Sequence, residues 1–141
     1  MQTANELTRK LKLAGMRMTP QRIAICRQLC ETDRHPTANQ IYENLKDDYP
    51  SLSLMTVYNT LKTLVEVGAI RFIGSACDGN AHYDGDIDPH INLACISCNK
   101  IVDIPDSAAV LDKIHSAVPQ GYKIIRSSVL IYGLCPDCQK D

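Results

Sequence analysis

Through the first half of the chain, apolar residues recur every three or four positions, which is the spacing of amphipathic helices. A first helix is predicted to stop at Gly15, and Thr19 and Pro20 suit the N-cap and first position of a second helix. The expected buried positions of these two helices are Leu7, Leu11, Ala14, Ile23, Cys26 and Cys30.

Two further helices are predicted from the same spacing. Thr37 and Gln40 have the arrangement of a capping box at the start of a third helix, in HPTANQIYENL. Ser53 can cap a fourth helix, which is expected to end near Gly68. The apolar faces of these helices are expected at Ile41, Leu45, Leu54, Val57, Leu61 and Leu64.

After the fourth helix the pattern changes to that of short strands. AIRFIG (69–74) and AHYD (81–84) have strand-like composition, and the turn-forming residues Asp78, Gly79 and Asn80 separate them. Three or four short helices followed by a hairpin predict a winged helix, a fold that many DNA-binding proteins use.

The second half opens with HINLACISC, residues 90–98, which otherwise has the apolar character of a buried strand. Strand alternation places two groups on opposite faces, His90 and Asn92 on one and Leu93, Cys95 and Ser97 on the other. Farther on, DSAAVLDKIHSAV (106–118) is predicted to form an amphipathic helix and YKIIRSSVLIYG (122–133) a strand. The fold class is therefore expected to be α+β.

Length and composition fit a globular protein of one ordinary domain or two small ones, since the chain has 141 residues and is 45% hydrophobic. No run approaches the roughly 18 apolar residues that cross a bilayer, and the N-terminal segment lacks the features of a signal peptide. We therefore expect a cytoplasmic protein with no membrane partner.

The net charge differs in sign between the two halves of the chain. Residues 1–71 hold ten Lys and Arg against seven Asp and Glu, a net +3, whereas residues 72–141 hold five against nine, a net −4. The first thirty residues contain a single acid, Glu6, beside the cations Arg9, Lys10, Lys12, Arg17, Arg22 and Arg27. Clustered cations on one domain of a near-neutral protein indicate a polyanionic partner, although a solvated helical face would also explain them.

The polar face of the predicted fourth helix supports double-stranded DNA as that partner. It carries hydrogen-bonding side chains and almost no acids, so it does not repel phosphates and its groups can reach base edges. The residues on this face are Ser53, Thr56, Tyr58, Asn59, Thr60, Lys62 and Thr63. With Arg17 nearby in the basic segment, nucleic-acid binding is favoured over a merely solvated face.

The strongest chemical signal is a pair of CxxC motifs, Cys95-x-x-Cys98 and Cys135-x-x-Cys138. Four thiolates from two such motifs can complete a tetrahedral zinc site, which would stabilise a small domain with little core. A dithiol redox enzyme is the alternative, but a thioredoxin-like protein normally carries one such motif. The other cysteines, Cys26, Cys30 and Cys77, are interpreted as structural or spare thiols.

The motifs GMRMTPQR, HPTANQIYENL, SLMTVYNTLKTL, HINLACISCNKIVDI and YGLCPDC, in this order, resemble the ferric uptake regulator family of metal-dependent bacterial repressors. The resemblance covers essentially the whole chain and is strongest to the peroxide-sensing members. It implies a homodimer, with a winged-helix DNA-binding domain at 1–84 and a small α/β dimerisation domain with a four-cysteine zinc site at 85–141. It also implies a separate regulatory metal, Fe²⁺ or Mn²⁺, at the hinge.

Residue by residue, the resemblance assigns the regulatory metal ligands to His35, Asp84, His90 and Asp103. Asp103 matches an aspartate typical of the peroxide sensors. The family's remaining histidine falls on Asn92, and an amide is a weaker donor than imidazole, so Asn92 or His82 is left open as a further ligand. His82 is two residues before Asp84 and is therefore expected on the same strand face. Oxidation by peroxide is expected at His35 or His90.

Another metal site found in some family members is not expected, because its histidine positions are Pro89 and Ser127 here. His115 is expected to be solvated. The predicted function is a metal-dependent repressor, not an enzyme, that responds to peroxide. The alternatives are an iron- or manganese-responsive uptake repressor and, outside this class, a zinc-ribbon interaction protein or a CxxC redox enzyme.

Overall fold

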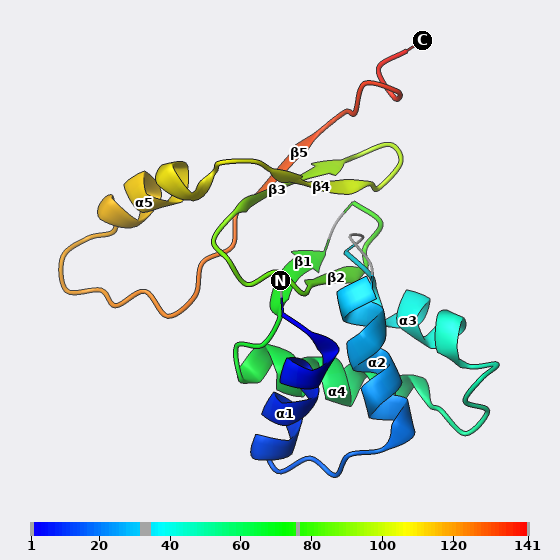
Figure 1. Ribbon diagram of the computed structural model, residues 1–141. Helices are drawn as coiled ribbons and strands as arrows, with labels where there is room; N and C mark the ends of the chain where they lie inside the picture. Colours follow the sequence, from blue (N-terminus) through cyan, green and yellow to red (C-terminus); the bar gives the residue numbers. More distant parts are fainter. Residues whose placement is uncertain (1, 32–34, 76, 141) are drawn as a thin grey trace. The chain divides into compact units, whose positions relative to one another are not determined.

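A computed structural model describes residues 2–31, 35–75 and 77–140 of the chain (Figure 1). The chain forms two compact units, one comprising Met1–Ser75 with Asn80–Ile87 and the other Ala76–Gly79 with Asp88–Asp141. The first unit is a set of helices followed by a β-hairpin, and the second is a small mixed sheet with one helix. The α+β class expected from the sequence is confirmed.

The first unit contains α1 (Ala4–Leu13), α2 (Pro20–Glu31), α3 (Ala38–Leu45) and α4 (Leu54–Glu66). Their ends have the predicted chemistry. Thr37 and Gln40 form the reciprocal capping box of α3, and the Ser53 hydroxyl accepts a hydrogen bond from the Thr56 backbone N–H at the start of α4. After α1, Gly15 has a φ of +84°, a conformation that glycine adopts without strain.

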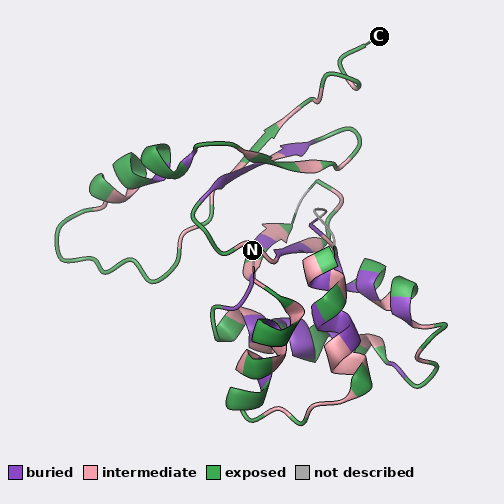
Figure 2. Cartoon of the chain, viewed as in Figure 1, coloured by how far each residue is buried: buried purple, intermediate pink, exposed green. Residues whose placement is uncertain are grey.

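The buried faces of these helices form one core (Figure 2). The predicted positions on α1, α3 and α4 are correct except that Ala14 is exposed and Leu54 only half-buried. On α2 the prediction was partly wrong, because Ile23 and Cys30 are half-buried whereas Ile25 and Leu29 are fully buried with Cys26. Helix α2 contacts α1, α3 and α4, so its buried face is wider than a single stripe.

The predicted hairpin is present as β1 (Arg71–Ser75) and β2 (Ala81–Asp84), which pair antiparallel. The register shifts between Phe72 and Gly74, which is the signature of a β-bulge and increases the local twist. Helices followed by this hairpin make the first unit a winged helix, with the hairpin as the wing.

The second unit is built around β3 (Ile91–Cys95), which lies between β4 (Ile101–Ile104) and β5 (Leu130–Gly133). The β3–β4 pair is antiparallel and the β3–β5 pair is parallel. The parallel pair β3–β5 needs a long crossover, which the chain makes through β4 and helix α5 (Ala108–Ser116). The Ser107 hydroxyl before α5 accepts a hydrogen bond from the Ile91 backbone N–H at 2.8 Å and so ties the helix start to β3.

Two expectations for the second unit were wrong. The segment 122–133 was predicted as one strand, but only Leu130–Gly133 is a strand, because the parallel partner β3 begins only at Ile91 and Leu130 already pairs with Asn92. His115 was expected to be solvated, but its Nε2 lies 2.8 Å from the Ser127 hydroxyl and its side chain is half-buried.

None of the helices in the described part of the chain combines the length and hydrophobicity needed to cross a membrane.

Leu61→Ala should lower the free energy of unfolding of the first unit by about 2–5 kcal/mol, because it leaves a cavity in the core on α4. Met55→Ala on the same helix is the matched control. Its side chain is 65% exposed, so the expected change is within about 0.5 kcal/mol. Urea denaturation followed by circular dichroism measures both values, and equal effects would contradict the placement of the core.

Candidate functional site

The four cysteines of the CxxC motifs meet at one edge of the second unit's sheet. Cys95 is the last residue of β3, and Cys135 follows shortly after β5. Because β3 and β5 are parallel neighbours, their carboxyl ends lie at the same edge and bring the two motifs together. The four sulfur atoms all lie within 4.8 Å of one another.

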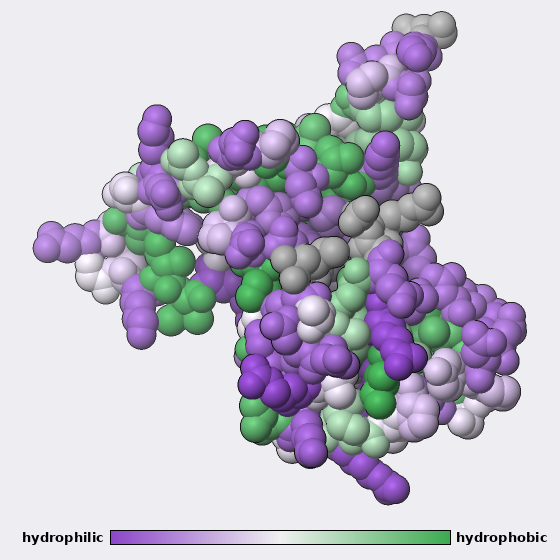
Figure 3. Space-filling model, viewed as in Figure 1, coloured by the Kyte–Doolittle hydropathy of each residue, from purple (hydrophilic) through white to green (hydrophobic). Residues whose placement is uncertain are grey.

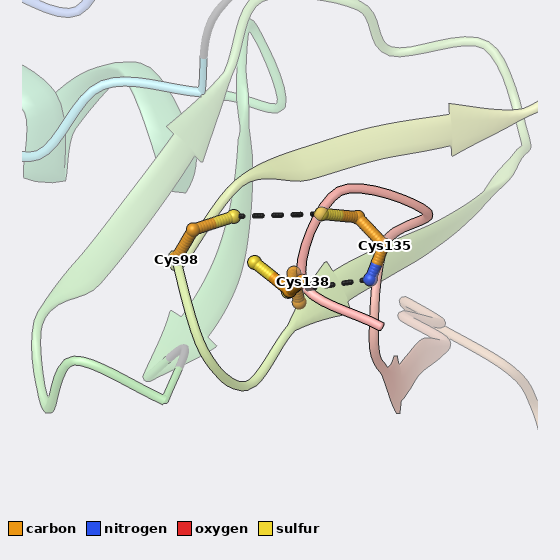
Figure 4. A group of neighbouring side chains, drawn as sticks. Cys98, Cys135 and Cys138 are labelled. Atoms are coloured by element: carbon orange, nitrogen blue, oxygen red, sulfur yellow. Dashed lines mark hydrogen bonds between the residues drawn. The ribbon is translucent and has the colours of Figure 1, made fainter. Parts of the chain in front are cut away.

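The sulfur geometry suits zinc. Cys98 Sγ and Cys135 Sγ face each other at 3.9 Å, with Cys138 beside them (Figure 4). A tetrahedral site with Zn–S bonds of about 2.3 Å has S···S edges of about 3.8 Å. The Cys135 backbone N–H donates to Cys95 Sγ at 3.4 Å, which links the two motifs directly.

The electrostatics of the four-cysteine cluster also favour a bound cation. Backbone N–H groups of Cys135, Cys98 and Ser97 lower the pKa of Cys95 to about 6, because they stabilise its thiolate. The Ser97 hydroxyl lowers the pKa of Cys138, but the sulfur atoms of Cys135 and Cys98 outweigh it and raise this pKa to about 12. A bound metal ion would compensate the repulsion between thiolates held this close together.

Elsewhere, Cys26 is buried in the core and Cys77 is exposed. Burial raises the pKa of the Cys26 thiol to about 11, so this group is an unreactive core residue as expected.

A histidine–aspartate pair lies in the first unit. His35 Nε2 is 3.4 Å from Asp84 Oδ2, and both side chains are largely buried. Strand β2 holds the segment that follows His35 beside Asp84. Thr37 forms a β-bridge with His82, and the Tyr83 backbone N–H donates to the Pro36 carbonyl oxygen.

Gly85 allows the chain after Asp84 to pass close to α2. A Cβ atom at this position would lie 3.0 Å from the Leu29 carbonyl oxygen, which is tighter than nine in ten contacts of this kind. The glycine is therefore part of what places Asp84 beside His35.

A second histidine–aspartate pair lies in the second unit. His90 Nε2 is 3.3 Å from Asp103 Oδ1, and the same oxygen accepts a hydrogen bond from Asn92 Nδ2 at 2.8 Å. The alternation predicted for residues 90–98 is thus confirmed for His90 and Asn92, which reach the same partner on β4.

The second pair has the donor arrangement of a cation site. His90 Nδ1 lies 2.7 Å from the Asp88 carbonyl oxygen, which can only accept, so Nδ1 carries the ring hydrogen. In the neutral ring Nε2 then has a lone pair, and its neighbour at 3.3 Å is a carboxylate oxygen. A metal ion between these two atoms could be bound by both of them. The backbone bond to Nδ1 is also the usual way of orienting a metal-binding imidazole.

His82, left open in the sequence as a further metal ligand, lies in the wing and contacts the backbone of His35. Its Nδ1 lies 2.6 Å from the His35 carbonyl oxygen and its side chain is buried. This contact fixes the ring against the backbone of His35, which is the position of a supporting residue of the wing.

The polar face of α4 is narrower than predicted. Thr60 is fully buried, and its hydroxyl donates to the Thr56 carbonyl oxygen. Thr63 donates in the same way to Asn59, and the Ser53 and Thr56 hydroxyls bond to each other.

The exposed side chains of α4 are Met55, Tyr58, Asn59, Lys62 and Glu66; Tyr58 is 41% exposed, and Lys62 Nζ lies 3.9 Å from Glu66 Oε1. Arg17, before α2, is also exposed, and its carbonyl oxygen accepts a hydrogen bond from the Arg22 guanidinium. Phenol, amide and cationic groups are suited to contacts with bases and phosphates.

Residues 13–132 match the family model described as Ferric uptake regulator family. The chain is 34% identical over 131 residues to the Peroxide-responsive repressor PerR of Staphylococcus aureus, which covers 92% of this chain and 86% of that protein. The solved structure of PerR from Streptococcus pyogenes, described for peroxide sensing and gene regulation, is 34% identical with a TM-score of 0.55, covering 99% of this chain and 95% of that one. The Helicobacter pylori ferric uptake regulator Fur shares the fold at 18% identity, with a TM-score of 0.80 and coverage of 99% and 96%.

Purified protein should contain one Zn²⁺ per chain, and Cys138→Ser should lose this zinc together with the folded second unit, because three thiolates do not complete the tetrahedron. Cys77→Ser is the matched control, since this exposed cysteine lies outside the cluster. Metal analysis and circular dichroism measure both effects. A Cys138→Ser protein that keeps its zinc and its fold would contradict the assignment.

Proposed function

The chain belongs to the ferric uptake regulator family, and on this premise we propose that it is a metal-dependent transcriptional repressor that responds to peroxide. The observation that carries the proposal is the pair of imidazole–carboxylate contacts, His35 with Asp84 and His90 with Asp103. Relatives whose names include peroxide-responsive repressor support the finer assignment. As a repressor it would act in the cytoplasm and would not be an enzyme.

Two kinds of metal have separate roles in this proposal. Zinc at Cys95, Cys98, Cys135 and Cys138 is structural, because thiolates from two motifs enclose it on all sides. Fe²⁺ or Mn²⁺ is regulatory and is bound jointly by His35, Asp84, His90 and Asp103. Imidazole with carboxylate is a donor set suited to these ions. Since two of the ligands come from each unit, metal binding would select one arrangement of the units, the one that binds DNA.

Operator DNA is the proposed partner of the first unit. Helix α4 would enter the major groove, where Tyr58 and Asn59 reach base edges while Lys62 and Arg17 contact phosphates. The excess of cations in the first thirty residues would add sequence-independent attraction. The bulged wing, β1 with β2, would lie beside the groove.

A homodimer through the second unit is supported by its exposed hydrophobic side chains. Figure 3 shows hydrophobic groups at the surface of the part of the chain that carries α5 and the segment after it. The exposed residues are Val110, Ile114, Tyr122, Ile124, Ile125, Ile131, Tyr132 and Leu134. A small unit that leaves this many large apolar groups in water needs a partner to cover them, and a second copy supplies a matching surface.

Peroxide sensing would use the histidine rings. In net terms, one oxygen atom of hydrogen peroxide would be inserted at a ring C–H of His35 or His90, and the other would leave as water, so the ring supplies both electrons. Bound Fe²⁺ supplies the one-electron chemistry that starts this reaction. The modified ring would be a poorer ligand, so its unit would release the metal and the DNA-binding arrangement would be lost.

An iron- or manganese-responsive uptake repressor without oxidation chemistry is the second candidate, because the same ligands would serve it. Cysteine-based sensing is less favoured, since thiolates enclosed around zinc are shielded from oxidants.

Tyr58→Ala should weaken binding to the specific operator by about 1–3 kcal/mol, because it removes a base contact. Arg17→Ala should weaken binding to all sequences and reduce the slope of log K against log salt by about 1, because it removes a phosphate contact. Fluorescence anisotropy in the presence of Mn²⁺ measures both. Lys140→Ala, at the far end of the chain, is the charge control. Unchanged affinity in both variants at matched salt would exclude this docking.

Peroxide should abolish operator binding of the Fe²⁺ form much faster than that of the Mn²⁺ form, since Mn²⁺ does not readily reduce peroxide by one electron. Mass spectrometry of the Fe²⁺ form should then show a gain of about 16 mass units, one oxygen atom, on the peptide containing His35 or His90. Equal loss in both forms, or oxidation confined to cysteines, would favour the uptake repressor.

A further inference from the structure

We infer that Asn92 is a positioning residue, which holds Asp103 for the regulatory metal through a side-chain hydrogen bond and does not itself bind the metal. The inference rests on the proposed function and deepens it. In the family resemblance, this position holds a histidine ligand. Here the residue at this position, Asn92, would act on the metal only through Asp103.

The register of the sheet brings the two side chains together. Asn92 on β3 lies directly opposite Asp103 on β4, and Asn92 Nδ2 donates to Asp103 Oδ1 at 2.8 Å. Asn92 is 0% exposed and lies on the central strand, and its backbone N–H donates to the Val129 carbonyl oxygen on the β5 side. The donor is therefore fixed from both neighbouring strands.

Asp103 needs this support. Its side chain is 46% exposed and lies on an edge strand of only four residues, where a carboxylate can adopt several rotamers. The oxygen that Asn92 holds is Oδ1, the same atom that lies 3.3 Å from His90 Nε2. The amide thus fixes the carboxylate oxygen that faces the imidazole, which is the arrangement expected of a supporting group behind a metal ligand.

The chemistry of the amide makes Asn92 the donor and Asp103 the acceptor of this hydrogen bond. An amide nitrogen has two hydrogens to donate and no lone pair available to a metal ion. Turning the amide by 180° would place its oxygen 2.8 Å from a carboxylate oxygen, which is repulsive unless a cation joins the two. In the competing arrangement, a cation lies between the two oxygens and Asn92 is a ligand. A double-mutant cycle distinguishes this arrangement from the direct hydrogen bond.

The experiment measures the Mn²⁺ dissociation constant of the zinc-loaded, full-length protein by calorimetry. Asn92→Leu keeps the branching of the buried side chain and removes both the donor and the oxygen, and Asp103→Ala removes the carboxylate. If Asn92 acts through Asp103, Asn92→Leu alone should weaken binding by about 10–100-fold. In the Asp103→Ala background the same substitution should have almost no further effect.

Asn44→Ala is the matched control, because Asn44 also donates to a side-chain oxygen, that of Gln28 at 3.1 Å, but lies on α3. Zinc content and circular dichroism check that each variant is folded, and Asn92→Ala replaces Asn92→Leu if the larger side chain disturbs the sheet. NMR of the metal-free wild type gives a further readout, since the Asn92 side-chain N–H signal should shift in Asp103→Ala.

If the fold-losses of Mn²⁺ affinity in the two single variants multiply in the double variant, Asn92 is an independent ligand and the inference is overturned. Unchanged affinity in Asn92→Leu, or an Asn92 amide signal that does not respond to Asp103→Ala, would overturn it as well. A wild-type protein that binds zinc but no Mn²⁺ would instead reject the regulatory site itself, and the positioning role with it.

Discussion

The register between β3 and β4 is the constraint on which the chemistry of the second unit depends. It places Asn92 opposite Asp103, and it closes the turn in which the Cys95 backbone N–H donates to the Lys100 carbonyl oxygen at 2.9 Å. A shift of one residue would turn every side chain of β3 to the opposite face. His90 and Asn92 would then lose Asp103, and Cys95 would leave the edge at which Cys135 lies.

This register has little hydrophobic support within the unit itself. The buried apolar residues there are few, namely Ile91, Ala94, Cys95 and Leu111, and α5 is exposed over most of its surface. A small core stabilises a fold weakly, so zinc binding at the ends of β3 and β5 would contribute directly to folding. The exposed apolar groups after α5 point to the same requirement for additional support.

In the first unit, the helix proposed to read DNA also carries much of the core. Val57, Leu61 and Leu64 are buried on one side of α4, and several hydroxyls on the other sides bond to the helix itself. These internal bonds leave Tyr58, Asn59, Lys62 and Glu66 as the exposed polar groups of the helix. The rigidity of the helix therefore comes from the core, and its capacity for recognition comes from these few side chains.

The sequence by itself determined the features that depend on local spacing. The helix ends and the hairpin turn follow from capping and turn residues that act on the backbone a few residues away, and the CxxC pairs are recognised from the spacing of their cysteines. The tertiary structure alone decided that Ile25 and Leu29 form the buried face of α2, that β5 begins only at Leu130, and that His115 meets Ser127. It likewise decided that Asn92 donates to Asp103. Each of these outcomes depends on atoms from distant parts of the chain, whose distances no local pattern contains.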